Sequence, residues 1–123
     1  MKLKTLKINI FQMKYKIIFT LAIKFKRWYL VENNKKSIGK STLIYQLASK
    51  YNLPIYTNWE DLYRGYNVIT PTDCLPRIMS FENKVILVDI MTYQTSLEIM
   101  YILSRKNNIL IGFTSEVDFN RKD

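Results

Sequence analysis

From residue 28 onward, short apolar runs alternate along the chain with amphipathic stretches. The apolar, β-prone runs predict strands at 28–31, 54–57, 85–90 and 109–113. Helical spacing of apolar residues predicts a helix at 40–51 and a second one that starts at Thr95 or Ser96 and stops at Asn107. Because strands and helices alternate, we expect a three-layer α/β/α fold around a mostly parallel sheet of about four to five strands.

Residues 58–80 lack a long periodic run. They predict a helical turn at 58–64, a short strand at 66–69, and a loop or short helix at 71–80. With 123 residues, 48% of them hydrophobic, the chain has enough apolar content for one domain with a buried core. We therefore expect one α/β domain over 28–123, preceded by an extension over 1–27.

The extension has no turn residue that would divide it into elements. Alternating positions at 12–17 and 23–27 suit a strand, whereas the continuous apolar run at 17–23 suits a buried helix or strand, so both structures stay open. That run is too short to span a bilayer, which takes about twenty residues. No A-x-A cleavage site follows it, as a signal peptide would require. We therefore expect a cytoplasmic protein.

Positive charge is concentrated at the N-terminal end of the chain. Residues 1–31 contain eight Lys and Arg and no Asp or Glu, whereas the other 92 residues contain 11 basic and 10 acidic side chains. Almost all of the net charge of +9 therefore precedes the first predicted helix of the domain. A basic segment with interspersed aromatic residues is attracted to nucleic acid or to an anionic membrane surface. The alternative is a charged helix or hairpin that packs on the sheet with its lysines in solvent.

Composition excludes several chemistries. The chain has no histidine and one cysteine, Cys74. It therefore cannot form a Cys/His zinc site, a Ser-His-Asp triad, a Cys-His nucleophile pair or an internal disulfide. Phosphate and carboxylate chemistry remain.

The strand predicted at 28–31 is followed by a polar loop and by a helix start that contains Gly39, Lys40 and Ser41. In a phosphate-binding loop, backbone N–H groups and the helix N-terminus face the phosphates, a lysine reaches the β- and γ-phosphates, and a hydroxyl coordinates Mg²⁺. Lys40 and Ser41 are the candidates for the last two roles. The candidate nucleotide-binding residues of this segment are Asn34, Lys35, Lys36, Ser37, Ile38, Gly39, Lys40, Ser41 and Thr42.

This segment resembles the Walker A motif, G-x-x-x-x-G-K-[ST], of the P-loop NTPase superfamily. It departs from the motif at Asn34, which stands where the first glycine is expected. Asparagine is, after glycine, the residue that best tolerates left-handed backbone, so the loop can still form.

A second segment, 84–89, resembles the Walker B strand of the same superfamily. Its continuous apolar run belongs in the middle of a parallel sheet, and it ends in Asp89. Ligands bind outside the carboxyl ends of parallel strands, which predicts that Gly39, Asp89 and Thr114 lie at one rim. The resemblance implies that Asp89, with Ser41, holds Mg²⁺ directly or through water, and that Thr114 senses the γ-phosphate. The alternative for Asp89 is a buried strand that merely ends in aspartate. The alternative for Thr114 is a strand end exposed to solvent.

Many ATPases of the superfamily follow the Walker B aspartate with a glutamate that activates water. Here Ile90 follows, so we do not expect fast hydrolysis by that route. Glu32, Glu60 and Asp61 are other acids near the predicted rim, but their spacing assigns none of them as the catalytic base.

The resemblance covers about residues 28–115 and implies binding of a Mg-nucleotide, most commonly ATP. The chain is similar to the minimal NTPase-like proteins of phages and mobile elements, which suggests an ATP-binding protein or weak ATPase of DNA metabolism. Such a protein would contact nucleic acid, further copies of itself or a partner ATPase. One alternative is a nucleoside or nucleotide kinase, with Glu60 or Asp61 as base and Arg105 or Arg121 at the transferred phosphoryl group. The other is a P-loop relic that binds nucleic acid or a protein through its basic extension.

Overall fold

The computed structural model describes residues 3–32, 39–90 and 94–114. Its elements, in chain order, are α1 (Leu3–Phe25), β1 (Tyr29–Glu32), α2 (Lys40–Tyr51), β2 (Ile55–Thr57), the 3₁₀ helix η1 (Glu60–Tyr63), β3 (Val68–Ile69), α3 (Leu75–Met79), β4 (Val85–Ile90), α4 (Gln94–Arg105) and β5 (Ile109–Thr114). The bounds of α2 and β4 equal those predicted from the sequence. The other predicted strands begin and end within two residues of their expected bounds.

The five strands form one parallel sheet in the order β1-β5-β4-β2-β3. β4 and β5 are adjacent, and each is buried along its whole length except at its first residue, which is half-buried. Parallel strands of this kind read as continuous apolar runs because helices cover both of their faces. The expected α/β fold is confirmed, and every strand pair in the described part of the chain is parallel.

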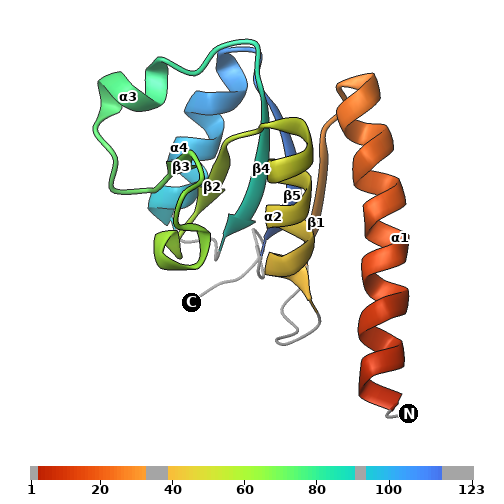
Figure 1. Cartoon of the computed structure of the whole chain (residues 1–123). Helices are drawn as coiled ribbons and strands as arrows, with labels where there is room; N and C mark the ends of the chain where they lie inside the picture. The colour runs from red at the N-terminus through yellow and green to blue at the C-terminus, as the bar shows by residue number, and fades with distance from the viewer. Residues whose placement is uncertain (1–2, 33–38, 91–93, 115–123) are drawn as a thin grey trace, which may run out of the picture.

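Helices lie on both faces of the sheet (Figure 1). Successive side chains of a strand point to opposite faces, and β4 follows this rule. Leu87 packs in the core cluster that contains residues of α1 and α2, whereas Ile86 and Val88 pack in the cluster that contains residues of α3 and α4. The sheet therefore separates two hydrophobic cores.

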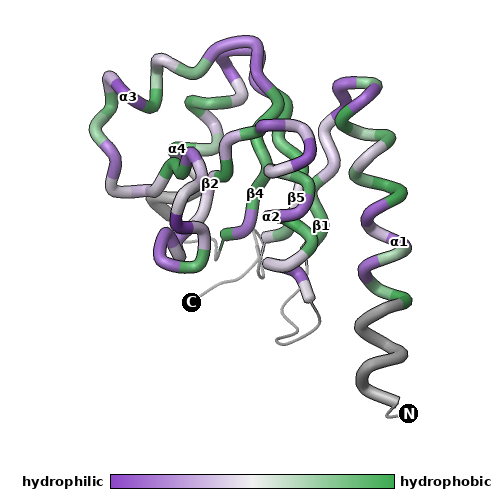
Figure 2. The backbone as a smooth tube through the Cα atoms, in the orientation of Figure 1, coloured by the Kyte–Doolittle hydropathy of each residue, from purple (hydrophilic) through white to green (hydrophobic). Residues whose placement is uncertain are grey.

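The N-terminal extension forms one long helix, α1, which resolves the choice that its sequence left open. Phe19 and Ala22 are buried in the same core cluster as α2, and the rings of Phe11, Tyr15 and Phe19 lie 5.0 to 5.5 Å from that of Phe113 on β5. Hydrophobic and hydrophilic positions are interspersed along the coloured part of α1, after residue 9 (Figure 2). None of the described helices combines the length and the apolar character needed to cross a bilayer.

Two asparagines position the ends of helices. Asn52 closes α2 in the left-handed conformation, as expected of a stop signal. Asn108, 1% exposed, follows α4 and uses its side-chain amide to donate to the carbonyls of Phe81 and Leu103 and to accept from the N–H of Lys84. This residue ties the start of β5 to the segment that precedes β4.

Gly112 of β5 lies in register with Val88 of β4 and has a φ of +152°. A Cβ on this residue would lie 2.0 Å from the Val88 carbonyl oxygen, which is backbone and cannot move without separating the two strands. We expect Gly112→Ala to lower the free energy of unfolding by about 3 kcal/mol or more, as measured by urea denaturation.

Gly65→Ala is the matched control for this substitution. Gly65 also has a positive φ, +87°, but no atom lies within 4 Å of an added Cβ. Only the left-handed backbone then opposes the alanine, at a cost of about 1 kcal/mol. Equal losses of stability in both variants would contradict the importance of the contact between Gly112 and Val88.

Candidate functional site

The N-terminus of α2 is the first part of the candidate site. Gly39 precedes the helix with a φ of 86°, in the left-handed conformation that glycine adopts most easily, and its carbonyl accepts the N–H of Leu43 at 3.1 Å. Lys40 and Ser41 are the first two residues of the helix, and Thr42 follows in the same turn. The first N–H groups of a helix have no acceptor within the helix itself, so the backbone of this turn can serve as a donor to a ligand at this end.

Five of the predicted nucleotide-binding residues, Asn34, Lys35, Lys36, Ser37 and Ile38, lie outside the described residues. Gly39, the next residue, is described, and it has a neighbour that the sequence did not predict. The side-chain amide of Gln12 on α1 donates a hydrogen bond to the Gly39 carbonyl at 3.4 Å. A Cβ on Gly39 would lie 2.4 Å from the same amide nitrogen, so α1 closely covers the backbone at this point.

Asp89 lies next to the last residue of β4, at the carboxyl end of the sheet. Its neighbours in register are Thr57 of β2 and Phe113 of β5, and the residue is 6% exposed. Thr114, 5% exposed, lies one position further along β5, between Ile90 of β4 and β1. The strand ends and the N-terminus of α2 therefore share one rim of the sheet, where ligands of parallel α/β folds bind.

A buried tyrosine joins the two parts of the site. Tyr63, at the end of η1, donates its hydroxyl proton to the Oδ2 atom of Asp89, and the Ser41 hydroxyl hydrogen-bonds the same tyrosine hydroxyl. Ser41 and Asp89 are therefore both neighbours of the Tyr63 hydroxyl. The structure therefore brings together the two residues that were predicted to hold Mg²⁺.

Tyr63 was not predicted from the sequence. It lies 26 residues before Asp89, in a segment whose only regular feature was a helical turn. The turn placed an aromatic residue near the carboxyl end of β2, but no spacing rule links a 3₁₀ helix to the end of a strand that comes later in the chain. The contact depends on β2 and β4 being neighbours in the sheet.

Burial dominates the electrostatics of the cluster. It raises the pKa of the Asp89 carboxyl, and the Tyr63 hydrogen bond and the positive charge of Lys40 oppose this rise. Burial lowers the pKa of the Lys40 ammonium, and the nearby Asp89 charge opposes this fall. The pKa of the Tyr63 hydroxyl is raised by burial and by Asp89, so this group stays protonated as a donor.

The arrangement provides one carboxylate, one small hydroxyl and one lysine beside a helix N-terminus. Nowhere in the described ranges do three or more Asp, Glu or Cys side chains gather as they would in an all-protein metal cage. Mg²⁺ commonly takes only one or two protein oxygens and completes its shell with water and substrate phosphates. Asp89 and Ser41 fit that requirement, and Lys40 with the α2 N-terminus suits the phosphates.

Two of the three acids considered as catalytic bases, Glu60 and Asp61, lie on η1. Glu60 is exposed and, with Asn58 and Thr70, lines a depression of about 440 Å³ beyond the ends of β2 and β3. Asp61 is exposed and lies 3.5 Å from Arg64 in an ion pair. Glu32 ends β1, in register with Thr114.

Of the two arginines considered for a kinase, Arg105 does not lie at the cluster. Arg105 ends α4 beside the start of β5, which is the opposite rim of the sheet, and its guanidinium donates to the Tyr101 hydroxyl at 3.2 Å. Arg121 lies outside the described residues.

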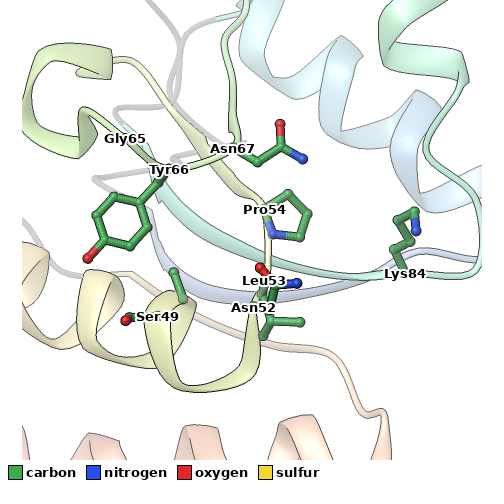
Figure 3. Close-up of a pocket in the computed structure, with 9 residues that line it drawn as sticks. Ser49, Asn52, Leu53, Pro54, Gly65, Tyr66, Asn67 and Lys84 are labelled. Atoms are coloured by element: carbon green, nitrogen blue, oxygen red, sulfur yellow. The ribbon is translucent and has the colours of Figure 1, made fainter.

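A cavity of about 430 Å³ also lies on the opposite rim, between the end of α2 and the starts of β2 and β4 (Figure 3). Ser49, Asn52, Asn67 and Lys84 supply its polar lining. Because Asp89 and Lys40 lie at the other ends of these strands and of α2, the cavity is separate from the candidate site.

The raised pKa of Asp89 has a testable consequence for stability. The Asp89 carboxyl titrates near pH 4 in the unfolded chain and at a higher pH in the folded one. Between these two pH values the folded state therefore binds more protons than the unfolded state. Stability contributed by this group is therefore lost as the pH rises from about 4 through the folded pKa. Asp89→Asn removes the buried charge, and we expect it to raise the melting temperature at pH 7 by about 2–5 °C.

The same substitution should flatten the fall of melting temperature between pH 4 and pH 7, as followed by circular dichroism. Asp61→Asn is the control, because that carboxylate is exposed. A lower melting temperature for Asp89→Asn than for wild type at pH 7 would contradict the cost assigned to the buried charge.

The chain matched no protein-family model, no curated protein and no solved structure. A functional assignment therefore depends on the geometry of Lys40, Ser41, Tyr63 and Asp89. These residues come from three separate segments and meet at a rim where parallel α/β folds bind ligands. That convergence identifies the cluster as the candidate functional site.

Proposed function

We propose that the protein binds a Mg-nucleotide, with ATP as the expected ligand, at the rim formed by the start of α2 and the end of β4. The proposal is supported chiefly by one observation: Ser41 and Asp89 hydrogen-bond the same tyrosine hydroxyl while Lys40 interacts electrostatically with Asp89. In this proposal Lys40 and the α2 N-terminus bind the phosphates, and Ser41 and Asp89 hold Mg²⁺ directly or through water.

The energetics of the cluster favour a charged ligand. Asp89 is buried, and burial opposes its ionisation more than its neighbours support it, because its pKa is raised overall. A divalent cation would compensate that charge, and nucleotide phosphates would stabilise the charged form of Lys40. Each charge that burial disfavours in the free protein would thereby gain a further opposite charge in the complex.

Binding is better supported than rapid hydrolysis. Ile90, which follows Asp89, is 1% exposed and carries no group that could activate water. Thr114 lies beside it on β5 and supplies a hydroxyl within the same rim. We therefore propose a nucleotide-binding protein with weak ATPase activity at most, in which nucleotide occupancy itself is the functional signal.

A kinase is the second candidate, and one observation favours it. Glu60 lines a depression at the same rim of the sheet as Asp89, with polar neighbours that could hold an acceptor hydroxyl. Transfer of phosphate from ATP to a nucleoside or nucleotide, lost in Glu60→Gln, would distinguish a kinase from a binding protein.

The direct test is calorimetric titration of ATP with Mg²⁺ into the wild type, Lys40→Ala and Lys50→Ala. Lys50 is an exposed lysine at the other end of α2, so its removal changes the net charge equally without touching the site. We expect Lys40→Ala to weaken binding at least about tenfold, the effect of losing about 1.4 kcal/mol. We expect Lys50→Ala to bind as wild type does.

Two results would oppose the proposal. If the folded wild type binds no nucleotide with Mg²⁺, the cluster is a structural relic of a phosphate site. If Lys40→Ala and Lys50→Ala weaken binding equally, the effect is one of net charge and not of the site.

Tyr63 provides a second prediction. Tyr63→Phe removes the donor that Asp89 uses in the free protein, and we expect a loss of about 1–2 kcal/mol of stability. Affinity for Mg-ATP should stay equal or increase, because the cation no longer competes with a hydroxyl for the carboxylate. Thermal melts with and without Mg-ATP measure both effects, and a loss of the ligand-induced shift would show that Tyr63 itself contacts the nucleotide.

A further inference from the structure

α1 is apolar on two faces, and only one of them packs on the sheet. The inner face contributes Phe19 and Ala22 to the core. The outer face of α1, as we define it, carries five large apolar side chains that are 50–68% exposed: Ile10, Met13, Ile17, Leu21 and Phe25. Their spacing of three or four residues places them along one side of the helix over about 24 Å.

The apolar surface continues beyond the end of the helix. Trp28 and Tyr29, which are 46% and 41% exposed, come soon after α1. Tyr29 is the first residue of β1, an edge strand of the sheet. Together with Leu21 and Phe25 they line a shallow depression of about 270 Å³. Figure 1 shows α1 on the outer flank of the molecule.

Positive charge accompanies this surface. Lys14 lies four residues after Ile10, and Lys24 lies three residues after Leu21, so both belong to the outer face, and both are exposed. Residues 1–31 contain no acid to offset them. Lysine side chains of this kind lay their apolar stems along the helix and extend their ammonium groups to the rim of a contact.

We propose that the outer face of α1 is a docking surface for an anionic lipid bilayer, on which the helix lies parallel to the membrane plane. Apolar side chains enter the boundary between headgroups and acyl chains, lysines contact the lipid phosphates, and Trp28 and Tyr29 occupy the interface that aromatic residues prefer. The inference goes beyond nucleotide binding and does not depend on it.

Charge and shape favour a bilayer over a second copy of the chain and over nucleic acid. A second copy would bring two helices of the same positive charge together. A nucleic acid backbone would bind the lysines but would leave five large apolar side chains in water. A bilayer satisfies both properties and needs no matching groove.

The test is sedimentation of the full-length chain, without nucleotide, with vesicles of phosphatidylcholine alone or with one quarter phosphatidylglycerol. We expect binding to the anionic vesicles only, weakening as salt is added. Leu21→Asn should lower the partition coefficient roughly tenfold, because a leucine no longer enters the bilayer. Lys14→Gln should lower it less and reduce its salt dependence.

Leu75→Asn is the matched control. Leu75 is 50% exposed, as Leu21 is, but it lies on α3 at the other face of the sheet, so this variant should bind as wild type does. Trp28 reports the contact directly: in a Trp59→Phe background its emission should shift to shorter wavelength with anionic vesicles.

Three outcomes would overturn the proposal. One is no binding of folded wild type to anionic vesicles. Another is an equal loss of binding in Leu21→Asn and Leu75→Asn. The third is self-association in sedimentation velocity, or binding to nucleic acid, that Leu21→Asn abolishes while vesicle binding is unchanged, which would assign the outer face to that occupant.

Discussion

The structure depends on the parallel pairing of β4 and β5 at the centre of the sheet. Both strands are buried apart from their first residues, so helices must cover both faces and the chain must cross from one face to the other. The pairing requires glycine at 112, because any side chain there would collide with the Val88 carbonyl. It also fixes Asp89 and Thr114 at the same rim, and β2, on the other side of β4, delivers Tyr63 to that rim.

The polar cluster at the rim reduces the stability of the free protein, and in the proposed function its groups would bind the ligand. Burial opposes the charges of both Asp89 and Lys40. The Tyr63 hydroxyl, which donates to Asp89, and the attraction between the two charges compensate only part of that cost. For stability alone, an aliphatic residue would suit the buried position of Asp89, as one suits the next position, Ile90. A carboxyl and an ammonium whose pKa values are shifted in opposite directions by burial are typical of functional sites.

α1 connects this site with the outer surface of the molecule. Its inner face completes the aromatic cluster around Phe113, and Gln12, near its middle, donates to the carbonyl of Gly39 where α2 begins. Its outer face presents apolar side chains and lysines to solvent. The α/β core covers one of the two apolar sides of this helix, and the other side is exposed.

Local patterns in the sequence determined the strands and helices of the domain, because a buried parallel strand needs a continuous apolar run and a covering helix needs apolar residues on one face. They also singled out Lys40 and Ser41, which follow Gly39 at a predicted helix start, and Asp89, which stands near the end of a predicted strand. The tertiary structure alone decided the rest. The sequence of α1 left helix and strand open, because apolar residues on two sides of a helix give an irregular linear pattern. In the structure α1 is a helix, and one of its apolar faces packs on β5. Tyr63 joins the site because strand order brings β2 beside β4, and strand order depends on long-range packing that no local pattern encodes.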